Sequence, residues 1–178
     1  MNMTKTKKTV LSALLLALLI ILSRFVAIQT QLLVVSFSFV PIMMSAIWLG
    51  PKYSMLIAAL GDFIGAILFP FGSYFPGFTI SGGIVGAVYG IFLKRDFDNK
   101  INERKFIIGL IISSILVLIL DGIFLRSLWL NILYGKAFWV IVSSRVIAEL
   151  IKIPIQIVSI YFLDKATRNY VDKYLLGD

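Results

Sequence analysis

The groups with the most distinctive chemistry in this sequence are ionisable side chains inside apolar segments. Between residues 138 and 163, five polar residues recur at intervals of four and three: Arg145, Glu149, Lys152, Gln156 and Ser159. These intervals place them on one face of a helix, over about 21 Å at about 1.5 Å per residue. A helix segment of this length covers most of the thickness of a membrane. A charged side chain inside the membrane must face protein or water and find partners there. We therefore expect this stripe to face the interior of a helical bundle.

Other apolar segments also carry charges, and together they leave a positive surplus toward the outer side of the membrane. Asp62 lies among small residues, which let helices approach closely. The intramembrane charges are four cations and three anions: Arg24, Arg126, Arg145, Lys152, Asp62, Asp121 and Glu149. Two interpretations stay open. The charges either form buried ion pairs that fix helix register, or they are completed by an anionic ligand that enters from outside.

An aromatic, helix-breaking loop separates two of the apolar segments. The stretch FPFGSYFPGFT, from Phe69 to Thr79, contains four phenylalanines, Tyr74, two prolines and two glycines. With a cytoplasmic N-terminus and six spans, this loop lies on the outer side of the membrane, together with the stretch QTQLLVVSFSF at 29–39. Apolar walls with a few placed polar groups are typical of ligand pockets, whereas aromatic belts at a membrane interface are usually Trp and Tyr. We therefore favour a pocket wall over a belt.

The composition identifies an integral membrane protein and excludes several kinds of chemistry. The chain has 178 residues, 60% of them hydrophobic, and a mean hydropathy of +0.98, well above that of soluble domains. It has no cysteine and no histidine, which excludes disulfides, thiolate metal sites and histidine-based triads. The phosphate-binding pattern G-x-x-x-x-G-K-[ST] is absent from the sequence. We expect a cell-membrane protein that is not an enzyme and uses no cofactor, metal or nucleic acid.

The apolar segments predict one all-α membrane domain, residues 1–178, with six transmembrane helices. The expected spans are about 8–28, 37–49, 53–69, 75–93, 106–130 and 138–163. The second and third are short against the roughly 20 residues that cross a bilayer, so we expect tilt or shielding by neighbours. The first segment is followed by no small-x-small cleavage site, and we expect it to remain as a helix and not to be a cleaved signal peptide.

The basic residues indicate the orientation of these spans. With the N-terminus in the cytoplasm and six spans, both termini are cytoplasmic, and most Lys and Arg residues lie inside, as the positive-inside rule requires. Twelve of the seventeen basic residues then lie inside: Lys5, Lys7, Lys8, Lys52, Lys94, Arg95, Lys100, Arg104, Lys105, Lys165, Arg168 and Lys173.

Small residues at intervals of four mark surfaces for close helix packing. Gly82, Gly86 and Gly90 repeat along the fourth span, and we expect them to pack within the chain. Ala13 and Ala17 form an Ala-x-x-x-Ala patch in the first span. For this patch, contact with another membrane subunit and contact within the chain are both open.

Several stretches resemble the substrate-binding S-components of energy-coupling-factor (ECF) vitamin transporters, in particular their folate-specific branch. They are LSRFVAI, VSFSFVPIMMSAIWLGP, GDFIGAILFPFGSYFPGFT and GGIVGAVYGI, which cover about residues 22–91, and SRVIAELIKIPIQ in the sixth span. The resemblance implies an S-component that binds a vitamin from outside with high affinity and delivers it inward. It also implies a transmembrane coupling subunit and two ATPase subunits as partners, with Ala13 and Ala17 facing the coupling subunit.

Folate, as the ligand that this resemblance implies, fits the residue types. A carboxylate reads the donor edge of a pterin with two hydrogen bonds, and Asp62 is the first candidate, Glu149 the second. Hydroxyl contacts are expected from Ser38 and Thr79. Candidates for stacking on the rings are Phe37, Phe39, Phe69, Phe75, Phe78, Trp129 and Tyr134. Candidates for binding the tail carboxylates are Arg24, Arg126, Arg145 and Lys152.

Three alternatives compete with a folate-binding S-component. An S-component for riboflavin leaves the cationic surplus unexplained, because riboflavin lacks carboxylates, and thiamine is itself cationic. A membrane enzyme acting on lipid would use Asp62 and Glu149 as acid and base, but no nucleophile or metal pair accompanies them. A structural or assembly subunit would have buried ion pairs and no ligand.

Overall fold

The computed structural model describes residues 3–29, 34–70, 72–95, 102–135 and 137–171. Helices dominate these residues, and a two-residue antiparallel pair, β1 (Ile28–Gln29) with β2 (Val34–Val35), joins the first two helices. The helices are α1 (Lys5–Arg24), α2 (Phe39–Leu49), α3 (Pro51–Leu68), α4 (Pro76–Leu93), α5 (Glu103–Val117), the π-helix η1 (Leu118–Leu125), α6 (Arg126–Tyr134) and α7 (Phe138–Tyr170). The predicted all-α fold is confirmed.

Six helical rods result, because α5, η1 and α6 follow one another without a break. Five rods in the described residues are long and apolar enough to cross a membrane, and α2 is a shorter apolar helix. The fifth rod, Glu103–Tyr134, is longer than the expected span 106–130, and α7 continues to Tyr170, beyond the expected residue 163. The extra turns carry polar residues. Polar residues end the apolar segment that is visible in the sequence, but the helical hydrogen bonds continue through them. Asn102 caps the N-terminus of α5 by accepting a hydrogen bond from the Lys105 amide, 3.2 Å away.

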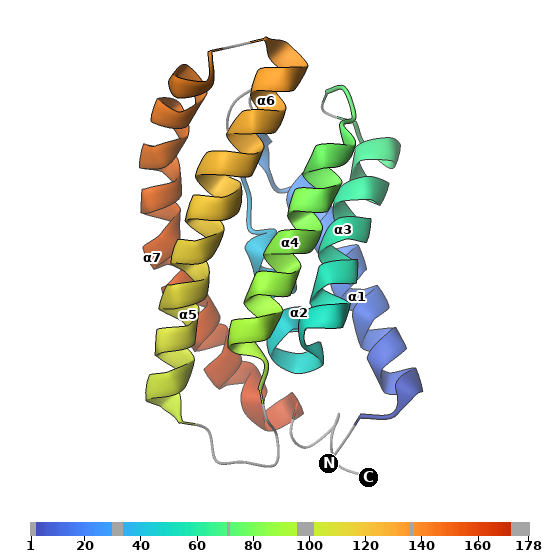
Figure 1. The fold of residues 1–178 in the computed structure, drawn as a ribbon. Helices are drawn as coiled ribbons and strands as arrows, with labels where there is room; N and C mark the ends of the chain where they lie inside the picture. Colours follow the sequence, from blue (N-terminus) through green and yellow to red (C-terminus); the bar gives the residue numbers. More distant parts are fainter. Residues whose placement is uncertain (1–2, 30–33, 71, 96–101, 136, 172–178) are drawn as a thin grey trace.

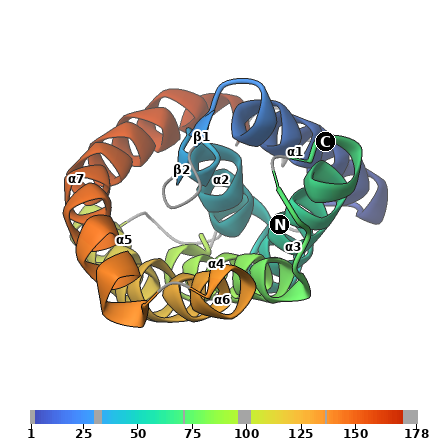
Figure 2. The same cartoon turned by 90° about the horizontal axis from the view of Figure 1, so that it is seen from above.

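The short helix α2 lies inside a ring formed by the other helices (Figures 1 and 2). Most of its side chains are buried, and Met43, Ala46 and Ile47 are completely inaccessible. This shielding explains how an 11-residue helix is accommodated in a membrane bundle. At its end, Gly50 adopts φ 82°, a left-handed conformation that suits glycine, and Pro51 starts α3 at once. The stretch WLGPKY therefore contains the tight turn between α2 and α3.

The glycine repeat of α4 packs against α3, as predicted. A side chain at Gly82 would begin 3.2 Å from the backbone oxygen of Ala58. At Gly86 and Gly90 it would collide with the backbone of Ser54 and of Pro51. The two helices therefore touch backbone to backbone, which only small residues permit.

The aromatic loop is shorter than the quoted stretch. α3 ends at Leu68 and α4 begins at Pro76, so Phe78 and Thr79 already lie in the first turns of α4. Proline is favoured at the first position of a helix because its missing N–H has no partner there. Phe71, in the middle of the stretch, lies outside the described residues.

The bundle has two chemically different ends. α1 begins and α7 ends at the same end of the bundle, which is also where α4 ends and α5 begins (Figure 1). Ten of the twelve basic residues predicted to lie inside belong to these ends and to the α2–α3 turn, whereas Lys100 and Lys173 lie outside the described residues. Arg24, Arg126 and Arg145 belong to the other half of the bundle, where the α3–α4 loop and the short β-pair also lie.

Candidate functional site

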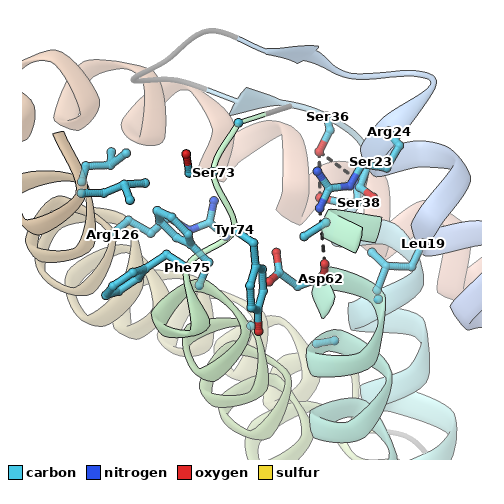
Figure 3. Close-up of a pocket in the computed structure, with 18 of the residues that line it drawn as sticks. Leu19, Ser23, Arg24, Ser36, Ser38, Asp62, Ser73, Tyr74, Phe75 and Arg126 are labelled. Atoms are coloured by element: carbon cyan, nitrogen blue, oxygen red, sulfur yellow. Dashed lines mark hydrogen bonds between the residues drawn. The ribbon is translucent and has the colours of Figure 1, made fainter. Parts of the chain in front are cut away.

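A cavity of about 560 Å³ lies at the end of the bundle opposite the chain ends. Its wall combines cationic, acidic, aromatic and hydroxyl groups from α1, the segment before α2, α3, the α3–α4 loop, α4, α6 and α7 (Figure 3). The charged residues of the wall are Arg24, Asp62, Arg126 and Arg145. Its aromatic residues are Tyr74, Phe75, Phe78 and Tyr134, and its serines are Ser23, Ser36, Ser38 and Ser73.

On one side of the cavity, the acid Asp62 is held by a short chain of hydroxyl groups. The Thr79 hydroxyl donates a hydrogen bond to Asp62 Oδ2 over 2.8 Å, and the Tyr74 hydroxyl lies 3.3 Å from the Thr79 oxygen. Arg24 reaches the same region and donates from Nη2 to the backbone oxygen of Asp62 over 3.4 Å. The Arg24 side chain fits there because Gly65 has none; a Cβ at Gly65 would lie 2.6 Å from Arg24 Nε.

On the opposite side, Arg126 forms an ion pair with Asp121, an intramembrane charge that was not among the predicted site residues. Arg126 Nε lies 2.7 Å from Asp121 Oδ2. The Asp121 side chain is 6% exposed, whereas that of Arg126 is 36% exposed. Figure 3 shows Arg126 beside Phe75, across the cavity from Asp62 and Arg24. The cavity therefore has a guanidinium group on each side.

The polar stripe of α7 forms an ion-pair chain beneath the cavity. Glu149 lies between two cations, with Lys152 Nζ at 2.6 Å and Arg145 Nη2 at 3.5 Å. Arg145 also donates from Nε to the backbone oxygen of Gly122 in η1 over 3.1 Å. Glu149 and Lys152 line a smaller cavity of about 90 Å³, which shares Ser36, Ser38, Ile42 and Arg126 with the larger one. This part of the stripe matches the interpretation of buried pairs that fix helix register.

The aromatic residues form two layers. Phe75 and Phe78 line the cavity with rings 6.1 Å apart in an edge-to-face arrangement. Trp129 stands behind Phe75, its ring centroid 5.5 Å away, and donates from Nε1 to the Ser81 hydroxyl over 2.9 Å. Gly77 makes room for this stack, since a Cβ there would meet both rings at less than 3 Å.

The structure separates the expected site residues into four groups. The large cavity is lined by Arg24, Ser38, Asp62, Phe75, Phe78, Arg126, Tyr134 and Arg145. The small cavity takes in Phe39, Glu149 and Lys152. Thr79 and Trp129 support lining residues from behind. Phe37 and Phe69 are not among the described lining residues; Phe37 packs on Phe39 and Phe69 on Phe25, with ring centroids 6.1 Å and 4.9 Å apart.

Some lining residues were not predicted. Ser36 sits one position before Phe37, and its hydroxyl is 2.7 Å from that of Ser38. Tyr74 belongs to the aromatic loop that sequence reasoning singled out. Leu130 and Leu133 lie on the same face of α6 as Arg126, a relation that becomes visible once Arg126 is placed in the site.

Comparison with known proteins gives a consistent result. The sequence model of the family described as ECF-type riboflavin transporter, S component, matches residues 3–168. The folate transporter FolT of Clostridium novyi (strain NT) is 33% identical over 159 residues, covering 89% of this chain and 88% of the relative. The folate transporter FolT of Leuconostoc mesenteroides subsp. mesenteroides is 38% identical over 163 residues, with 89% and 84% coverage.

Two solved structures share the fold. A crystal structure of FolT bound with folic acid has a TM-score of 0.80 and 32% identity, and the match covers 90% of this chain and 94% of that one. A structure of the S component of a bacterial ECF transporter has a TM-score of 0.73 and covers 96% and 100%. At 23% identity, this second likeness supports the fold alone. Together with the family match, these findings show that the chain is a multi-pass membrane protein that belongs to the family of S components of ECF-type transporters.

Proposed function

We propose that this chain is the folate-binding S component of an ECF-type importer, which captures folate from outside and delivers it inward. The observation that carries the proposal is the composition of the large cavity. Guanidinium groups of Arg24 and Arg126 lie on opposite sides, the carboxylate of Asp62 lies on the Arg24 side, and aromatic residues belong to the wall (Figure 3). A volume of about 560 Å³ lies within the usual range for small-molecule sites. The FolT relatives are consistent with this ligand.

The parts of folate match different parts of the cavity. Its pterin ring has an edge of N–H donors that a carboxylate binds with two parallel hydrogen bonds, and Asp62 is the acid that lines the large cavity among the described residues. The flat rings stack on aromatic side chains, and Phe75, Phe78 and Tyr134, which line the cavity, are our candidates for this contact. The glutamate tail carries two carboxylates, which guanidinium groups bind in a bidentate manner. Glu149 is already paired with two cations, so we assign the pterin edge to Asp62.

The description of the matching family names riboflavin, which makes riboflavin the second candidate ligand. Riboflavin has no carboxylate. Among the described residues, the large cavity is lined by the charged residues Arg24, Arg126, Arg145 and Asp62. Together with the ion-pair partners Asp121, Glu149 and Lys152 they make four cations and three acids, and this surplus of one positive charge favours an anionic ligand. Riboflavin would leave this positive surplus without a counter-charge.

The partners that we propose are a transmembrane coupling subunit and two ATPase subunits. Ala13 and Ala17 are exposed on α1, while Leu15 and Leu19 on the other face are buried in the bundle. An exposed Ala-x-x-x-Ala patch permits close approach of another membrane helix. In this proposal both chain ends are cytoplasmic, the large cavity opens to the outside, and the chain binds and releases its ligand without converting it.

Calorimetric titration of the purified protein with folate tests this function. We expect saturable binding heat at micromolar protein, and no displacement of folate by riboflavin. Protein purified from rich medium should release a pterin that mass spectrometry identifies. If folate gives no heat while riboflavin does, the folate assignment is wrong and the family assignment survives.

Tryptophan fluorescence gives an independent readout within the cavity wall. The Trp129 ring lies 5.5 Å from Phe75, which lines the cavity, whereas Trp139 is 77% exposed on the surface. Folate binding should quench the emission of Trp129. The quench should be largely lost in Trp129→Phe and retained in the matched control Trp139→Phe. Equal loss in both variants would contradict binding in this cavity.

A further inference from the structure

The π-helix η1 contains an ion pair that an α-helix would not form. Asp121 and Arg126 are five residues apart, and the Arg126 backbone N–H donates to the Asp121 backbone oxygen, the i to i−5 hydrogen bond of a π-helix. Their side chains meet at 2.7 Å, from Arg126 Nε to Asp121 Oδ2. In an α-helix with about 3.6 residues per turn, residues five apart point about 140° away from each other. The wider turn therefore brings the pair together.

The same turn sets the face that α6 presents to the large cavity. Arg126, Leu130, Leu133 and Tyr134 line the cavity at spacings typical of a single helix face. One residue fewer in the π-helical turn would rotate this face by about 100° relative to α5. The turn is fixed from α7, because Arg145 Nε donates to the Gly122 backbone oxygen over 3.1 Å. Single π-helical turns inside α-helices occur frequently at functional sites.

Arg126 has more donor capacity left for a ligand than Arg145 has. Arg145 is 4% exposed and binds Glu149 and Gly122. Arg126 uses Nε for Asp121, and its Nη1 and Nη2 donate no hydrogen bond to a described residue. A guanidinium group that is held at Nε presents its outer edge in a fixed orientation, and that edge binds a carboxylate with two hydrogen bonds.

We propose that Asp121 is a positioning residue: across the π-helical turn it holds Arg126 so that its terminal nitrogens bind the carboxylate tail of the ligand. The inference rests on the proposed function and adds to it the assignment of the tail. The second Asp121 oxygen, Oδ1, is buried and has no partner among the described residues. Among the described residues, Arg126 is therefore the ion-pair partner of the Asp121 carboxylate, and this ion pair fixes the orientation of the Arg126 side chain.

Two ligands and a double-mutant cycle test the inference. Affinities for folate and for 6-hydroxymethylpterin, which lacks the tail, are measured for wild type, Asp121→Asn, Arg126→Gln and the double variant. We expect Asp121→Asn to weaken folate binding about 10-fold or more and to change hydroxymethylpterin binding by less than about 2-fold. In the Arg126→Gln background, Asp121→Asn should have no further effect on folate, because residues that act through one contact are not additive.

Each other outcome has a defined meaning. Equal weakening of both ligands by Asp121→Asn indicates a structural role and overturns the inference, and so do unchanged folate affinity and additive effects in the double variant. If Asp121→Asn does not fold, Arg126→Lys tests the inference instead. Lysine keeps a positive charge beside Asp121 and lacks the two-nitrogen edge of the guanidinium group. Retained preference of Arg126→Lys for folate over hydroxymethylpterin would overturn the inference. Absence of folate binding to wild type would overturn the proposed function, and this inference with it.

Discussion

Replacement of Asp62 by asparagine tests the assignment of the pterin edge most directly. The change is nearly isosteric, and the asparagine oxygen still accepts the hydrogen bond that Thr79 donates over 2.8 Å. The fold should therefore be preserved. The variant loses the negative charge and one of the two acceptor oxygens, and its amide donors would then face the donors of the pterin. Hydrogen bonds to charged groups contribute about 1.5–3 kcal/mol, which corresponds to about a 10- to 100-fold loss of affinity.

A second effect of Asp62→Asn has the opposite sign, and the assay must separate the two. Removing this acid increases the positive surplus around Arg24 and strengthens attraction for the tail of folate. Calorimetry with 6-hydroxymethylpterin, which has no tail, measures the pterin contact alone. Thr79→Val is the control, because it removes the hydroxyl that orients Asp62 and keeps the charge, and we expect it to weaken binding by less than about 10-fold. Pterin affinity of Asp62→Asn within about twofold of wild type would refute the assignment.

Two further predictions concern helix packing. Gly86→Ala should lower stability by about 1–3 kcal/mol, seen as a lower melting temperature in detergent, because the new methyl collides with the backbone of α3; Gly83→Ala, whose methyl would have its nearest neighbours at 3.6 Å, is the matched control and should be close to neutral. Replacing Ala13 and Ala17 by leucine should spare folate binding and reduce assembly with the proposed coupling subunit and uptake into cells, because both positions are exposed on α1; normal uptake would exclude this patch as the coupling surface.

Much of the bundle could be predicted because its signals are local. Gly50 followed by Pro51 marks the turn between α2 and α3, since a left-handed glycine and an N1 proline are both readable from residue type. The glycine repeat of α4 and the stripe of α7 follow from helical periodicity alone. Arg145 and Lys152 lie four residues before and three residues after Glu149, so periodicity also places beside this acid the two cations with which it pairs.

The parts of the site that escaped prediction depend on geometry that the sequence does not display. Asp121 and Arg126 fall on different faces of a regular helix, so their pairing across the π-helical turn has no periodic signal. Trp129 and Phe75 both have the residue type of a pocket wall. Which of them faces the cavity is decided by the packing of α6 against the start of α4, where Gly77 leaves room for both rings.

The two interpretations of the buried charges apply at different depths of the same bundle. Around Glu149, Lys152 and Arg145 lie at 2.6 Å and 3.5 Å, so both cations are paired with this one acid, and the contacts of Arg145 fix α7 against η1. Closer to the cavity, Arg126 keeps donors that no described residue accepts from, although Asp121 neutralises its charge. An isolated ion pair between Asp121 and Arg126 does not require the outer edge of the guanidinium group to face the cavity. That edge contributes to binding only when a second carboxylate contacts it. The exposed edge of Arg126 is therefore the part of the charge network that a helix-register role leaves unexplained and an anionic ligand explains.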